Sequence, residues 1–139
     1  MFEKIYVNQT KNDVRIIAQK VAQSLSKGDI ILLNGNLGTG KTFFTKKLCG
    51  FLEVKDPVNS PSYVLLNEYT GKYKILHYDL FRISLVEEAL ALGVLDKLTE
   101  GITIIEWPEI IKEHINYKYI EMLFKHNGKN RDISLKYIV

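Results

Sequence analysis

The residue pattern with the clearest chemical meaning is a run of eight residues in the first third of the chain. It has the form G-x-x-x-x-G-K-[ST] and reads Gly35-Asn36-Leu37-Gly38-Thr39-Gly40-Lys41-Thr42. Glycines let such a loop curl so that its backbone N–H groups point inward and cradle phosphate oxygens. The lysine can reach the β- and γ-phosphates of a nucleotide, and the final hydroxyl can bind Mg²⁺. The sequence therefore predicts a phosphate-binding loop.

The residues on either side of this loop have the order that the chemistry requires. An apolar run at 29–34 predicts a strand that leads into the loop, and residues 43–52 predict a helix directly after it. This order places the N–H groups of the loop at the start of a helix, where anions bind. The alternative interpretation is a glycine-rich turn with an exposed lysine, and the flanking pattern disfavours it.

Two acidic residues follow predicted strands and could complete the site. Asp79 ends a predicted strand at 74–79, and Glu106 directly follows the β-branched run at 102–105. Ligands of open α/β sheets lie beyond the carboxyl ends of the strands, so both acids should face the phosphate loop. A phosphate loop needs such an acid to hold Mg²⁺ or its water. The structural alternatives are that Asp79 caps the next segment and that Glu106 pairs with Arg82.

Two further sets of side chains are weaker candidates. Ser60-Pro61-Ser62 lies where switch segments of phosphate-loop proteins reach toward the γ-phosphate. A hydroxyl there could contact Mg²⁺ or an attacking water, or the serines could simply cap a proline turn. His77 should share a face of its strand with Asp79. It could act as a general base, but we favour a hydrogen-bonded core histidine.

Composition and charge limit the class of protein. The 139 residues are 46% hydrophobic and 25% charged, which fits one globular domain over residues 1–139. The net charge of +3 comes from scattered lysines, so a solvated surface is favoured over a nucleic-acid patch. Cys49 is the only cysteine, which excludes an intrachain disulfide and a cysteine metal cluster. No secretory signal is visible, and no apolar run approaches the roughly 18 residues of a membrane span. We therefore expect a cytoplasmic protein with no membrane contact.

The remaining elements must position the candidate site. Thr10 and Asp13 resemble a capping box at the start of the first helix. Hairpins in the middle and at the end of the chain should make the central sheet mixed. The prediction is an α/β fold, a P-loop NTPase-like three-layer sandwich with a mixed central sheet. The predicted elements are a strand at 2–7, a helix at 12–25, a strand at 30–33, the loop helix at 43–52, strands at 63–69 and 74–79, a broken helix at 85–98 interrupted at Gly93, a strand at 102–105, a helical turn at 109–112, and strands at 117–125 and 133–139.

Several short motifs, taken together, resemble one protein family. The phosphate loop is followed in order by S-P-S-Y-V-L at 60–65, N-E-Y at 67–69, H-Y-D-L-F-R at 77–82 and I-E-W-P at 105–108. These motifs are similar to those of the TsaE (YjeE) family of bacterial ATPases, and the resemblance covers about residues 10–131. The phosphate loop alone would not distinguish this family, whereas its combination with the Asp-Leu-Phe-Arg and Glu-Trp-Pro segments does.

The resemblance implies an activity, a cofactor and a partner. Proteins of this family bind and hydrolyse ATP, and they assist the TsaD–TsaB complex. That complex places a threonylcarbamoyl group on the adenosine next to the anticodon of certain tRNAs. The resemblance therefore implies a Mg²⁺-dependent ATPase that is slow and partner-stimulated. It also implies contact with tRNA only indirectly, through TsaD–TsaB, and we expect a monomer or a weakly self-associating protein.

The resemblance also implies roles for individual residues. Lys41, Asp79 and Glu106 would be catalytic, with Thr42 and Glu106 as ligands of Mg²⁺ and Asp79 positioning the water or the metal shell. Ser62 takes the place of a switch threonine and keeps its hydroxyl. Changes at Asn36, Thr39 and Phe43 relative to the family pattern remove no phosphate or metal contact. The implied nucleotide-binding residues are Thr10, Gly38, Thr39, Gly40, Lys41, Thr42, Phe43, Ser62 and Arg131.

Two other functions stay open at this point. A small-molecule kinase needs a lid and arginines that close over the transferred phosphate. The chain has no lid-sized insertion, and only Arg82 and Arg131 could serve. A nucleotide-gated binding module would use ATP to order residues 54–62 and present a docking surface, with negligible hydrolysis. An assay of turnover with and without partner proteins separates this module from the ATPase.

Overall fold

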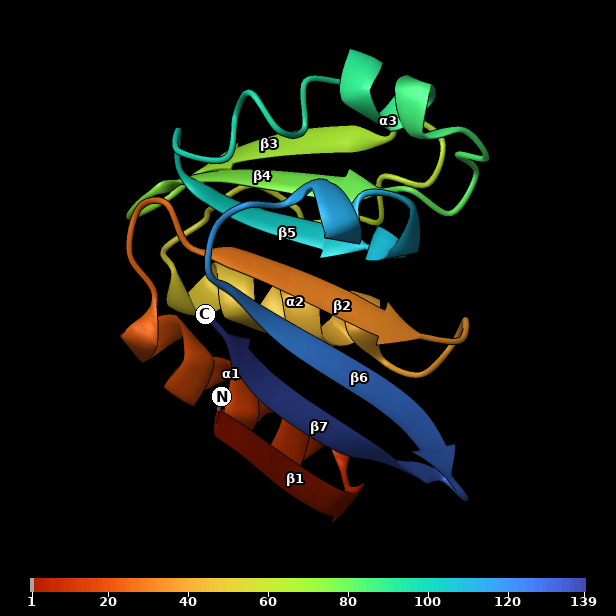
Figure 1. Ribbon diagram of the computed structural model, residues 1–139. Coiled ribbons are helices and arrows are strands. Elements are labelled where there is room, and N and C mark those ends of the chain that lie inside the picture. Colours follow the sequence, from red (N-terminus) through yellow and green to blue (C-terminus); the bar gives the residue numbers. More distant parts are fainter. Residues whose placement is uncertain (1) are drawn as a thin grey trace.

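A seven-stranded mixed sheet runs through the middle of the computed structural model, which describes residues 2–139 (Figure 1). Its strand order is β1-β7-β6-β2-β5-β4-β3. The central strands β4, β5, β2 and β6 are parallel neighbours, and antiparallel pairs flank them on both sides. The strands are β1 (Phe2–Gln9), β2 (Ile30–Gly35), β3 (Leu66–Thr70), β4 (Lys74–Asp79), β5 (Ile102–Glu106), β6 (Tyr119–Asn127) and β7 (Asn130–Ile138).

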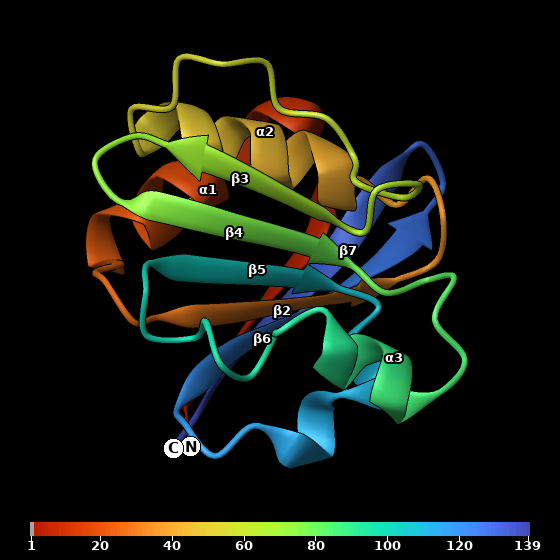
Figure 2. The same ribbon diagram turned by 90° about the horizontal axis from the view of Figure 1, so that it is seen from above.

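Helices lie on both faces of this sheet (Figure 2). Helices α1 (Lys11–Ser24) and α2 (Lys41–Phe51) pack together on one face. The short helix α3 (Val86–Ala91) covers the other face, together with 3₁₀ turns at Pro108–Ile110 and Lys112–His114. The helix, sheet and helix layers confirm the predicted sandwich with a mixed sheet.

Alternating side chains of the central strands divide the core into two clusters. Ile31 and Leu33 of β2 pack beneath α1 and α2, whereas Ile30 and Leu32 face α3. All four are fully buried, as expected for a parallel strand covered on both faces. Burying each such side chain contributes about 1.5–3 kcal/mol. The central strands are thus held firmly enough to fix the positions of the residues at their ends.

Helix α1 begins at the capping box that the sequence predicts. The Asp13 N–H donates to Thr10 Oγ1 over 3.2 Å, and the Thr10 N–H donates to Asp13 Oδ2 over 2.9 Å. The Thr10 backbone N–H, followed by the Thr10 side chain, lowers the pKa of the Asp13 carboxyl from 3.8. The ionised carboxylate therefore stabilises the folded protein fully above the unperturbed pKa. This stabilisation is lost as the pH falls through the lowered pKa of the folded state.

The structure corrects several predicted boundaries. The strand predicted at 63–69 is wrong in its first three residues, because Leu65 has a φ of 70° and its N–H donates to the Pro61 carbonyl over 2.6 Å. Such a turn cannot continue a strand, so β3 begins at Leu66. The broken helix predicted at 85–98 is regular only over α3 and ends before Gly93. The predicted turn at 109–112 is a pair of 3₁₀ turns.

Other elements agree closely with the sequence. Strand β4 has the predicted bounds, and β5 extends one residue further, to Glu106. The final hairpin is confirmed, although β7 begins three residues earlier than predicted and a two-residue turn joins Asn127 to Asn130. Of the helices in the described part of the chain, none combines the length and the apolar character that crossing a bilayer requires.

The cap of α1 can be tested by substitution of Thr10. The Thr10→Ala change removes the hydroxyl that accepts the Asp13 N–H, and it should lower the free energy of unfolding by about 1 kcal/mol. The measurement is urea denaturation followed by circular dichroism, without nucleotide. Thr10→Ser keeps the acceptor and should unfold near the midpoint of the parent protein. Equal losses in both variants would contradict the capping role.

Candidate nucleotide-binding site

The glycine loop joins the end of β2 to the start of α2, and its backbone conformation requires glycine. Gly35, Gly38 and Gly40 have φ values of 144°, 78° and 104°, which other residues rarely adopt. A Cβ atom at Gly35 would also lie 2.6 Å from the carbonyl oxygen of Phe124. The loop is closed by Thr39, whose hydroxyl donates to the Asn36 carbonyl over 2.7 Å. The sequence therefore folds here into a loop that ends at the N-terminus of α2.

Lys41 lies in the first turn of α2 with its ammonium group buried against neutral partners. Its Nζ donates to the Gly35 carbonyl over 2.5 Å and lies 3.8 Å from the centroid of the Trp107 ring. Burial lowers the pKa of Lys41, while the carboxylates of Glu106, Asp79 and Glu109 act in the opposite direction. A buried cation beside a helix N-terminus makes this end of α2 attractive to an anion.

The two strand-end acids lie side by side at the carboxyl edge of the sheet. Asp79 and Glu106 pair in the register of β4 and β5, and both are 3% exposed. Asp79 Oδ2 accepts hydrogen bonds from Ser62 Oγ over 2.9 Å and from Ser60 Oγ over 3.3 Å. Its Oδ1 accepts from the Phe81 N–H over 2.9 Å, so Asp79 also caps the segment that follows it. The structure thus brings the predicted switch serines to this acid.

Glu106 has a different partner from the arginine considered on sequence grounds. Its Oε2 lies 2.6 Å from His77 Nε2, and both side chains are buried. Arg82 instead lies over the Tyr63 ring, 4.4 Å from its centroid. The histidine therefore has the hydrogen-bonded core position that we favoured for it.

A pocket of about 220 Å³ opens between the glycine loop, the serine segment and the two acids. It holds most of the predicted site residues. Trp107 and Leu37 also line it, and sequence reasoning did not assign either residue to the site. The sequence feature that could have assigned Trp107 to the site is its position directly after the candidate acid Glu106. The lining residues are Leu37, Gly38, Gly40, Lys41, Thr42, Phe43, Ser60, Ser62, Asp79, Glu106 and Trp107.

Three of the predicted nucleotide-binding residues are not part of the pocket lining. Thr10 uses its hydroxyl in the cap of α1, and Thr39 uses its own to close the glycine loop. Arg131 donates to the Gln9 carbonyl over 3.2 Å, and its Nε lies 3.8 Å from where a Cβ on Gly40 would be. Arg131 therefore lies against the glycine loop from the side of β1 and β7.

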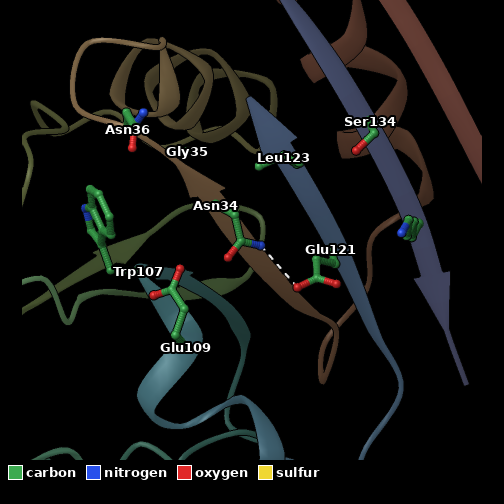
Figure 3. Close-up of a pocket in the computed structure, with 9 residues that line it drawn as sticks. Asn34, Gly35, Asn36, Trp107, Glu109, Glu121, Leu123 and Ser134 are labelled. Carbon is green, nitrogen blue, oxygen red and sulfur yellow. Dashed lines mark hydrogen bonds between the residues drawn. The ribbon is translucent and has the colours of Figure 1, made fainter. Parts of the chain in front are cut away.

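A larger hollow of about 380 Å³ also borders the glycine loop, at Gly35 and Asn36 (Figure 3). Trp107 lines both hollows, and the Asn34 amide donates to Glu121 Oε2 over 3.1 Å within the larger one. This larger hollow lacks Lys41 and the first turn of α2. The smaller pocket is therefore the better candidate for a phosphate-bearing ligand, because it combines the loop, the lysine and the acids.

The arrangement of loop, sheet and helices defines a class of protein, the P-loop NTPase-like fold. The crystal structure of YdiB from Bacillus subtilis is similar to this chain with a TM-score of 0.82. The similarity covers 99% of this chain and 87% of that chain, with 24% sequence identity.

Sequence comparison identifies the family within this class. The family model described as "Threonylcarbamoyl adenosine biosynthesis protein TsaE" matches residues 8–133. A relative from Rickettsia prowazekii named "tRNA threonylcarbamoyladenosine biosynthesis protein TsaE" is 39% identical over 124 residues, covering 88% of this chain and 86% of the relative. A protein of the same name from Aquifex aeolicus is 37% identical over 131 residues, covering 92% and 94%. This chain belongs to the TsaE family.

The glycine requirement of the loop gives a test on stability. Gly38→Ala should cost about 1–2 kcal/mol, because only the positive φ opposes a side chain there. Gly35→Ala should lower the stability further, because the new Cβ would be strained by the positive φ and would also clash with the Phe124 carbonyl. Chemical denaturation of both variants without nucleotide checks this order. A Gly35→Ala variant as stable as Gly38→Ala would show that the close approach is relieved.

Proposed function

We propose that this protein is a Mg²⁺-dependent ATPase that supports the threonylcarbamoyladenosine modification of tRNA. The observation that carries the proposal is one pocket that joins a glycine loop, a buried lysine and two strand-end carboxylates. The proposed role in threonylcarbamoyladenosine biosynthesis follows from membership of the TsaE family and from the names of the relatives. Residues 1–139 would act as one ATPase domain, and the cytoplasm is the proposed location.

ATP would bind with its phosphates on the glycine loop. Gly38 and Gly40 would offer backbone N–H groups, and Lys41 would turn from its neutral partners to the β- and γ-phosphates. The space around Gly38 fits this role, since nothing lies within 4 Å of where a Cβ would be. Phe43 lines the same pocket and would contact the nucleotide beside the first turn of α2. Thr10, Thr39 and Arg131 would support the conformation of the glycine loop or the binding of the nucleoside part of ATP.

Mg²⁺ fits the oxygen-rich part of this pocket. Hard cations of this kind prefer oxygen ligands and usually bind one or two carboxylates together with phosphate oxygens and water. Thr42 and Glu106 would hold the ion, which would neutralise charge on the phosphates when bound. Asp79 is held by three hydrogen bonds, two from the serine hydroxyls and one from the Phe81 N–H. Asp79 is therefore suited to orient the attacking water or the waters around the metal.

The proposed partner is the TsaD–TsaB complex, with tRNA reached only through it. The turn at 61–65 supports regulation by a partner, because Tyr63 is 83% exposed and Val64 is 65% exposed. The same turn contains Ser62, which is hydrogen-bonded to Asp79 in the pocket. A change in the contacts around the phosphates of ATP would therefore be passed through the Ser62–Asp79 hydrogen bond to the exposed residues of this turn. We propose a monomer, or at most weak self-association.

The Ser62–Asp79 hydrogen bond also keeps a second function in consideration. A nucleotide-gated binding module would use the same bond to order residues 54–62 around ATP and would hydrolyse it negligibly. The two functions share the binding site and differ in turnover. A rate measurement therefore separates them, whereas a binding measurement does not.

Substitution of the loop lysine tests the site. Lys41→Ala should lower the rate of ATP hydrolysis at least about 100-fold, because it removes the cation that meets the developing charge. Asp79→Ala should also abolish turnover, through loss of the group that orients water. Lys46→Ala is the matched control, since Lys46 is an exposed lysine of the same helix. Full hydrolysis by both Lys41→Ala and Asp79→Ala would disprove the site assignment.

The proposed partner gives a separate test. ATP hydrolysis should be slow for the purified protein and should rise when TsaD–TsaB from the same source is added. Steady-state phosphate release measures both rates, with Lys41→Ala as the blank. Tight ATP binding without hydrolysis in either mixture would favour the nucleotide-gated module instead.

A further inference from the structure

The contact between His77 and Glu106 stands apart from the other polar contacts of the site. His77 lies on β4, and its neighbour across the sheet is Ile104 of β5, two residues before Glu106. The two side chains therefore meet diagonally across adjacent parallel strands, with 2.6 Å between Nε2 and Oε2. The side chains of His77 and Glu106 are 0% and 4% exposed. A polar contact so short and so completely buried fixes both side chains.

The hydrogen-bonding capacity of the ring indicates the direction of this bond. His77 Nδ1 is buried and has no hydrogen-bond partner within the described residues. A proton on Nδ1 would leave a donor buried without an acceptor, while a bare Nε2 would face a carboxylate oxygen. The proton therefore belongs on Nε2, which donates to Glu106 Oε2. This bond occupies Oε2 and leaves Oε1 of the same carboxylate available to the pocket.

The surroundings of His77 exclude direct contact with a ligand in the pocket. Glu106 lines the pocket, whereas His77 is absent from its lining and lies behind the carboxylate. Asp79 has its own supports in Ser62 and the Phe81 N–H, so its orientation does not depend on the histidine. The contribution of His77 can therefore reach the site only through Glu106.

We propose that His77 is a positioning residue that holds the Glu106 carboxylate in the orientation required for Mg²⁺–nucleotide. This inference rests on the proposed function, in which Glu106 is a ligand of Mg²⁺. A free glutamate has several rotatable bonds, and ordering it at the moment of metal binding would cost conformational entropy. The hydrogen bond from His77 orders it beforehand. Partners of this kind typically change metal affinity or activity by about 10- to 100-fold when removed.

Two polar substitutions separate the hydrogen bond from mere filling of space. In His77→Gln the side-chain amide nitrogen can occupy the position of Nε2, whereas in His77→Asn it can reach only the position of Nδ1. His77→Asn should weaken Mn²⁺ binding to the protein–ADP complex by about 10- to 100-fold, measured by electron paramagnetic resonance. It should lower kcat for ATP hydrolysis by a similar factor and leave metal-free ADP affinity unchanged. His77→Gln should restore most of both properties.

Several outcomes would overturn the inference. One is parental Mn²⁺ affinity and kcat in His77→Asn, and another is an equal loss in His77→Gln and His77→Asn. A third is a further loss when His77→Asn is added to Glu106→Ala, since His77 must act through that carboxylate. If His77→Asn does not fold by circular dichroism, His77→Leu fills the site without a donor and repeats the comparison with His77→Gln.

The same experiment keeps this inference distinct from the proposed function. A parent protein that neither binds Mn²⁺–ADP nor hydrolyses ATP contradicts the proposed function itself. A parent protein that does both, together with His77 variants that behave like it, contradicts only the positioning role.

Discussion

The buried ammonium group of Lys41 is the constraint on which the rest of the site depends. Removing a charge from water is costly, and neighbouring groups must compensate for it. Here the compensation comes from the Gly35 carbonyl, the Trp107 ring and the nearby carboxylates. These groups belong to the ends of β2, β4 and β5 and to the segment after β5, so the lysine can be buried only where these three strands are neighbours. The parallel sheet is therefore a requirement of the site as well as its support.

The register of the central strands determines which residues meet at the lysine. Leu33 of β2 pairs with Glu106, and Glu106 pairs in turn with Asp79 of β4. The Trp107 N–H then donates to the Leu33 carbonyl over 3.2 Å, which extends the β2–β5 pairing past the end of β5. A shift by one residue would turn both acids to the other face. The apolar residues that alternate along these strands thus fix the chemistry at their ends.

Local patterns predicted the parts of this structure that depend on neighbours in sequence. The bounds of β4, the capping box of Thr10 and the acids at two strand ends follow from periodicity and spacing. The turn at 61–65 could not be predicted in this way, because the Leu65 carbonyl accepts the Asp79 N–H over 3.0 Å. That bond joins segments far apart in the sequence. The place of Trp107 beside Lys41 likewise depends on strand pairing rather than on its neighbours in sequence.

Asp79 connects the pocket to two exposed segments at once. Its carboxylate accepts from Ser62 and from the Phe81 N–H, and its own N–H donates to Leu65. The segment before β3 and the segment after β4 also meet at the surface, where Arg82 lies over the Tyr63 ring. Under the proposed function, a change in the ligands around Asp79 must act on both segments together, because each is bonded to the same residue. A protein bound to this surface would in turn alter the orientation of Asp79, since coupling between two sites is reciprocal.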